Sequence, residues 1–122
     1  RGSEAFTVAR KALKLAKRLD RKNGDIKMAM LDLSIQENKY AAITGDEFYF
    51  DSTRNNLVED YKKLNESSSY VSRDGGSDMG ARQQMNLIEN ALMQSNQTYE
   101  RSQLQKLTVE QESASYQNLQ LN

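Results

Sequence analysis

The sequence contains no cysteine, no histidine, no tryptophan and no proline. Without cysteine, the chain forms neither a disulfide nor a thiolate metal site. Without histidine, it lacks the side chain that most often serves as a general base or a metal ligand. The missing proline removes the commonest helix breaker, so long uninterrupted helices are permitted.

Long hydrophobic runs are also missing, and none approaches the ~18 residues of a transmembrane helix. Only 37% of the residues are hydrophobic, and the mean hydropathy is −0.85. A compact monomer of this composition would bury little apolar surface. The composition therefore favours a single helical domain over residues 1–122, with extended helices whose apolar stripes are completed by a partner or by another copy.

The zero net charge conceals an uneven distribution along the chain. Residues 1–27 hold nine Lys and Arg against three Asp and Glu, whereas the remaining residues hold eight against fourteen. Such a division indicates an anionic partner for the N-terminal part, or self-association of basic and acidic parts.

A basic amphipathic helix is predicted over residues 4–22, after residues 1–3, which are typical of a tag remnant. Its apolar residues recur at helical spacing as Val8, Ala12, Leu15 and Leu19, widened by Ala9, Leu13 and Ala16. Its basic face consists of Arg10, Lys14, Lys17, Arg18 and Arg21. Asn23-Gly24 predicts a left-handed turn after this helix.

A helical arm is predicted over residues 25–66, with Asp25 as its N-cap. Gly45 and the aromatic run at 48–50 favour a break within 45–51, followed either by strand-like structure or by a helix capped at Asp51 or Ser52. The alternative is one continuous helix, because a 3-4 spacing of mostly apolar residues runs from Tyr40 to Leu64 across Gly45.

The serines and glycines of residues 67–80 predict a flexible loop, and residues 81–122 predict a long C-terminal helix. Along that helix, apolar residues keep a 4-3 spacing in which Ser95 fills one core position. The loop would fold this helix back on the preceding arm. We therefore expect an all-α fold, either a helical hairpin or a small antiparallel bundle with coiled-coil-like helices.

No pattern in the sequence indicates chemistry. There is no phosphate-binding loop and no dinucleotide fingerprint. Residues 20–31 resemble a calcium loop only superficially, because Gly24 falls one position early and Leu31 stands where a glutamate is needed. We expect no catalytic site, no cofactor, no metal and no small-molecule substrate.

Protein–protein interaction is the function that this sequence favours, as a structural subunit of a larger assembly such as a secretion apparatus, an appendage or a virion. The expected helix interface comprises Leu57, Tyr61, Leu64, Met85, Ile88, Leu92 and Tyr99, and the basic face would steer association. The alternative is a peripheral binder of an anionic membrane through the N-terminal helix. Nucleic acid is less favoured, because no aromatic residues interleave with the Lys and Arg residues.

Overall fold

The computed structural model describes the backbone of residues 2–71 and 79–121 and the side chains of residues 2–67 and 80–114. The described backbone forms four α-helices, and no β-strand occurs within it. These helices are α1 (Gly2–Leu19), α2 (Gly24–Thr44), α3 (Glu47–Val71) and α4 (Met79–Leu121). The expected all-α class is confirmed for this part of the chain.

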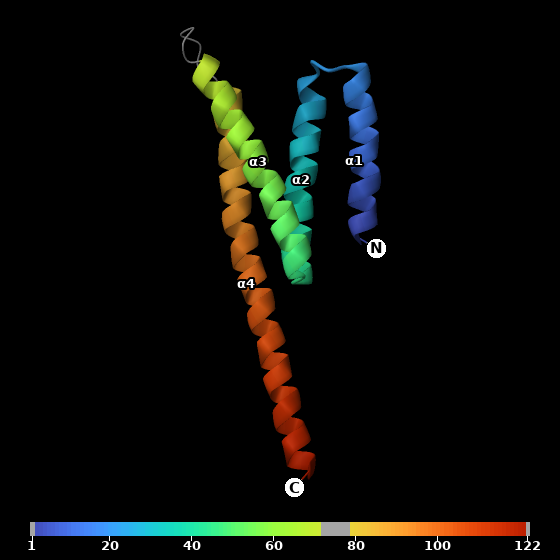
Figure 1. Ribbon diagram of the computed structural model, residues 1–122, viewed down its shortest axis with the longest axis vertical. Coiled ribbons are helices and arrows are strands. Elements are labelled where there is room, and N and C mark those ends of the chain that lie inside the picture. Colours follow the sequence, from blue (N-terminus) through green and yellow to red (C-terminus); the bar gives the residue numbers. More distant parts are fainter. Residues whose placement is uncertain (1, 72–78, 122) are drawn as a thin grey trace.

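Helices α2, α3 and α4 pack against one another, whereas α1 contacts α2 alone among the four helices. Successive helices run in opposite directions, and α1 forms an outer layer on α2 (Figure 1). Helix α4 passes the α2–α3 corner and continues well beyond it (Figure 1). The molecule therefore has a packed middle, an attached outer helix and a projecting helix.

The junction between α1 and α2 differs from the prediction. Asn23 is the N-cap of α2, with an extended backbone at φ −72° and a side chain that accepts from the Asp25 N–H at 2.9 Å. A turn follows α1 at residues 21–22, but neither Asn23 nor Gly24 is left-handed, and the expected cap at Asp25 is wrong. An asparagine oxygen caps a helix as well as an aspartate does, so the helix starts two residues earlier.

The corner between α2 and α3 is made by Gly45, which has a left-handed backbone at φ 72°. The Asp46 carboxylate then accepts from the Tyr49 N–H at 3.1 Å, as an N-cap residue does. The aromatic run is therefore helical, so neither the strand, nor the cap at Asp51 or Ser52, nor one continuous helix is correct. The 3-4 spacing across Gly45 reflects no shared contact there, because Ile43 and Glu47 on its two sides are exposed.

The expected loop at 67–80 is shorter than predicted, since α3 continues to Val71 and α4 begins at Met79. The serines of residues 67–69 are only slightly weaker helix formers than alanine, so they do not end a helix by themselves. The rest of that predicted loop, residues 72–78, lies outside the described residues.

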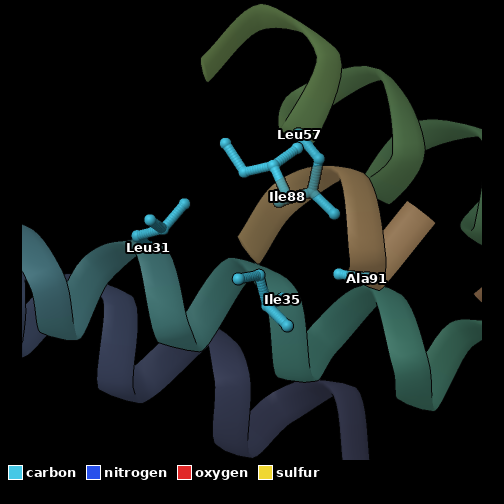
Figure 2. Close-up of a cluster of buried hydrophobic side chains, with 5 residues drawn as sticks. All are labelled: Leu31, Ile35, Leu57, Ile88 and Ala91. Atoms are coloured by element: carbon cyan, nitrogen blue, oxygen red, sulfur yellow. The ribbon is translucent and has the colours of Figure 1, made fainter. Parts of the chain in front are cut away.

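The core consists of two small apolar clusters. The first joins Leu31 and Ile35 of α2 to Leu57 of α3 and to Ile88 and Ala91 of α4 (Figure 2). The second joins Ala41 and Ala42 of α2 to Phe50 of α3, with Tyr49 and Tyr99 packed against it.

Buried polar side chains separate the two clusters. The Asn38 amide donates to the Thr53 hydroxyl at 3.2 Å, and both residues are buried. Ser95 is also buried and lies on α4 between Ala91 of the first cluster and Tyr99 beside the second. Polar groups inside a helix interface fix the register between helices, because a shifted pairing would leave them unbonded.

Truncating a core residue tests this packing. We expect Ile88→Ala to lower the free energy of unfolding by about 2–5 kcal/mol, because Ile88 is fully buried and its removal leaves a cavity. The exposed neighbour Leu87 is the control, and Leu87→Ala should change stability by less than about 0.5 kcal/mol. Urea denaturation followed by circular dichroism measures both. Equal losses would contradict the assigned core.

Candidate functional site

Most of the predicted helix-interface residues lie inside the chain's own core. Leu57 and Ile88 are fully buried and face each other between α3 and α4 (Figure 2). Tyr61, Leu64 and Leu92 pack against the same cluster. An outside partner would reach Leu57 and Ile88 only if α3 and α4 separated, whereas Tyr61, Leu64 and Leu92 are half-buried. Their role in binding a partner stays a prediction.

The remaining two, Met85 and Tyr99, are half-buried. The Tyr99 ring stacks on Phe50 with the ring centroids 4.3 Å apart and the planes 5° from parallel. Burial and the nearby carboxylates, first of all Glu47, raise the pKa of the Tyr99 hydroxyl. Tyr99 therefore binds α4 to the α2–α3 corner.

The fold engages one member of the predicted basic face. Arg10 turns inward and forms an ion pair at 2.5 Å with Glu37, whose side chain is only 8% exposed. Lys14 and Lys17 line a groove beside α3, and they are exposed, as are Arg18 and Arg21. The role of these four residues in binding a partner stays a prediction.

Glu37 connects three helices, a role that the sequence analysis missed. It accepts from Arg10 of α1 and, at 2.9 Å, from the Tyr49 hydroxyl of α3. Burial and this hydrogen bond raise the pKa of Tyr49. The signal in the sequence was a carboxylate in the middle of the least polar helix, next to a basic helix that could supply its partner.

Aromatic rings complete the attachment of α1. The Phe6 and Tyr40 ring centroids are 5.7 Å apart, and those of Tyr40 and Tyr49 are 6.3 Å apart. A Cβ added at Gly2 would clash with the Tyr40 side chain, so the N-terminal turn of α1 also approaches this tyrosine closely. Helix α1 is thus held mainly at its N-terminal half.

A groove of about 780 Å³ lies between α1, α2 and α3. Arg10, Lys14 and Lys17 line it from α1, and Glu59 and Asp60 line it from α3. Burial raises the pKa of Asp60, although Lys63 and Arg10 oppose the shift. Because charges of both signs meet across it, the groove offers no uniform field for an anion or a cation. No three acidic side chains in the described ranges are grouped as a metal site.

Helix α1 carries two neighbouring apolar stripes, and only one of them packs against the rest of the chain. Leu13 and the alanines Ala9 and Ala16 are half-buried against α2. The second stripe, which we call the α1 outer stripe, consists of Val8, Ala12, Leu15 and Leu19 and is exposed. Its large members are 59–90% exposed, and Lys11 and Arg18 lie along its edge.

Helix α4 makes its last described contacts at the α2–α3 corner. Ser102 donates to the Ala42 carbonyl at 3.0 Å, and both Gln103 and Lys106 donate to the Gly45 carbonyl, at 2.8 and 2.9 Å. These bonds satisfy carbonyls that the end of α2 leaves without a helical partner.

We call residues 104–121 of α4 the α4 overhang. All of its described side chains, from Leu104 to Ala114, are exposed. They include Leu104, Leu107 and Val109, which are 63%, 54% and 60% exposed. Leu104 and Leu107 share one side of the helix, and neighbouring exposed apolar side chains are typical of an interaction surface.

Comparison with known proteins identifies no relative of this chain. No protein-family model matches the chain, and neither the curated proteins nor the solved structures contain a significant match. Among the helices described, none has a stretch long and apolar enough to cross a membrane. The functional inference therefore depends on the exposed helix faces.

Replacing Arg10 tests how α1 is attached. We expect Arg10→Met to speed hydrogen exchange of the α1 amides at least about tenfold, because an unpaired buried carboxylate costs several kcal/mol. Lys11→Met is the control, because Lys11 is exposed and its replacement removes the same charge. Exchange is measured by mass spectrometry. Equal effects of the two substitutions would show that the ion pair does not hold α1.

Proposed function

We propose that this chain is a non-enzymatic structural or adaptor subunit that binds protein partners, including other copies of itself, through amphipathic helix faces. The observation that carries the proposal is the α4 overhang, where Leu104 and Leu107 are each more than half exposed on one side of a helix that continues past the α2–α3 corner (Figure 1). In this proposal α2, α3 and α4 form a small antiparallel bundle with coiled-coil-like helices, and a partner covers the apolar surface left over.

The energetics of a solitary helix support this function. A polar helix of this length has marginal stability alone in water, since most helical stability in proteins comes from packing. Burying a large apolar side chain contributes ~1.5–3 kcal/mol. Covering Leu104 and Leu107 is therefore sufficient to favour association and to stabilise the helix at the same time.

The biological setting of such a subunit stays a prediction from composition. The setting proposed is a secretion apparatus, an appendage or a virion, in which long, polar-rich helices would complete one another's apolar stripes. The α4 overhang suits such an assembly because it extends a contact surface beyond the packed part of the molecule (Figure 1).

Polar replacement of the overhang leucines tests the proposal. We expect the wild-type chain to self-associate, and Leu104→Gln with Leu107→Gln to weaken association about 100-fold, because two buried leucines are lost. Leu87→Gln is the control, since Leu87 is exposed on the same helix within the packed region. Sedimentation velocity over a range of concentrations measures all three. A wild-type chain that stays a single copy, or a double variant that associates normally, would contradict the proposal.

A second candidate function is peripheral binding to an anionic membrane. The α1 outer stripe supports it, because exposed Val8, Leu15 and Leu19 run along a basic helix. A helix of this kind can lie in the plane of a lipid surface with its apolar side chains inserted.

Vesicle co-sedimentation distinguishes the two functions. The protein-binding proposal expects the wild-type chain to stay in the supernatant with phosphatidylserine-containing vesicles at physiological salt. Membrane binding instead predicts pelleting that falls about 100-fold in the Lys14→Gln, Lys17→Gln, Arg21→Gln variant, since each cation near the surface contributes about 1 kcal/mol. Neutral phosphatidylcholine vesicles are the control for nonspecific adsorption.

A further inference from the structure

Two apolar helix faces remain uncovered in this structure, and they cannot cover each other within one molecule. The α1 outer stripe faces away from α2, and the α4 overhang projects past the α2–α3 corner, beyond the end of α1 (Figure 1). Helix α1 makes no helix contact except with α2 in the described structure. A partner for either face must therefore come from another molecule.

The two faces share the spacing of a coiled coil. The α1 outer stripe follows a 4-3-4 pattern from Val8 to Leu19. On the α4 overhang, Leu104, Leu107 and Ala114 fit a 3-4-3 pattern that has Gln111 as its third member. The overhang from Leu104 to Leu121 is also as long as α1. Helices with this period pack side by side through their apolar seams.

The charges beside the two faces are opposite in sign. Lys11 and Arg18 lie along the α1 outer stripe, and both are exposed. At 100° per residue, Glu110 lies beside the line through Leu107 and Ala114, and it is exposed as well. In paired helices, charges at these flanking positions select the partner and its orientation.

We propose that the α4 overhang of one copy packs along the α1 outer stripe of a second copy. The inference rests on the proposed function and names the partner surface. Pairing two overhangs in antiparallel instead would place Glu110 of both copies on the same side of the contact, and like charges at flanking positions oppose association. A lipid surface would cover α1 but would leave Leu104 and Leu107 exposed.

Charge reversal with rescue tests the pairing. The α1 variant carries Lys11→Glu and Arg18→Glu, and the overhang variant carries Glu110→Lys. Each variant alone should associate about tenfold or more weakly than wild type, because like charges now meet. An equimolar mixture should regain wild-type association, since each α1 then finds an overhang of opposite sign. Sedimentation velocity gives the masses, and circular dichroism confirms that each variant is folded.

A matched control separates the pairing from a general effect of charge. Lys22→Glu with Arg82→Glu makes the same charge change in the turn after α1 and near the start of α4, outside both faces, where it should leave association unchanged. All of the substituted residues are exposed, so they disturb no core packing.

A second measurement uses the absence of cysteine from the chain. Leu15→Cys and Leu107→Cys chains, mixed and treated with a bismaleimide, should yield a crosslinked pair that contains one chain of each kind. Leu107→Cys alone should yield little crosslinked product.

Four results would overturn the pairing. If the α1 variant alone associates normally while the overhang variant alone associates weakly, the contact is between two overhangs. Loss of vesicle binding in the α1 variant without any change in mass would show that α1 meets a membrane. A mixture that fails to recover association would exclude the complementary faces. Association that is sensitive to Leu104→Gln with Leu107→Gln but indifferent to both charge variants would refute this pairing and leave the proposed function standing.

Discussion

Helices α2, α3 and α4 pack against one another along a narrow line of contact that buries little apolar surface, and the remainder of the structure depends on this small core. Its two clusters contain three alanines among eight residues, so the helices approach closely but bury few large side chains. Asn38, Thr53 and Ser95 interrupt the line with buried polar groups. No described atom bonds the Asn38 carbonyl oxygen or the Ser95 hydroxyl, which makes this layer costly unless it fixes the register. We infer that the bundle sacrifices stability for one defined pairing of its helices.

Because the middle of the molecule is thinly packed, its two outlying parts are attached by polar groups. Helix α1 is held through Arg10, Glu37 and Tyr49 together with a few aromatic contacts, and none of its described residues is fully buried. Helix α4 is fixed at the corner by hydrogen bonds to the carbonyls of Ala42 and Gly45. Neither attachment covers the α1 outer stripe or the α4 overhang. Both faces are therefore available for association, and they are the surfaces through which the proposed function would act.

The sequence predicts the helices well and their contacts poorly, for a physical reason. Helical periodicity correctly placed Ile88 and Ser95 on the inner side of α4, and Gly45 correctly indicated a break. Periodicity states which residues share a face but not which molecule covers that face. The residues expected to bind a partner, such as Leu57, accordingly lie in the chain's own core. For the same reason, spacing alone joined the covered and the exposed apolar residues of α1 into one wide stripe. Glu37 was missed because a charged residue is normally exposed, and its partner lies 27 positions away.

The central claim is that the helices of one chain have too little apolar surface for themselves and share it with neighbours. Hydrogen exchange of residues 107–121, measured together with molar mass over a wide range of concentration, tests it most directly. The account predicts fast exchange of these amides in dilute solution and protection that increases in step with mass. Strong protection at every concentration, in a solution that contains only single chains, would contradict it.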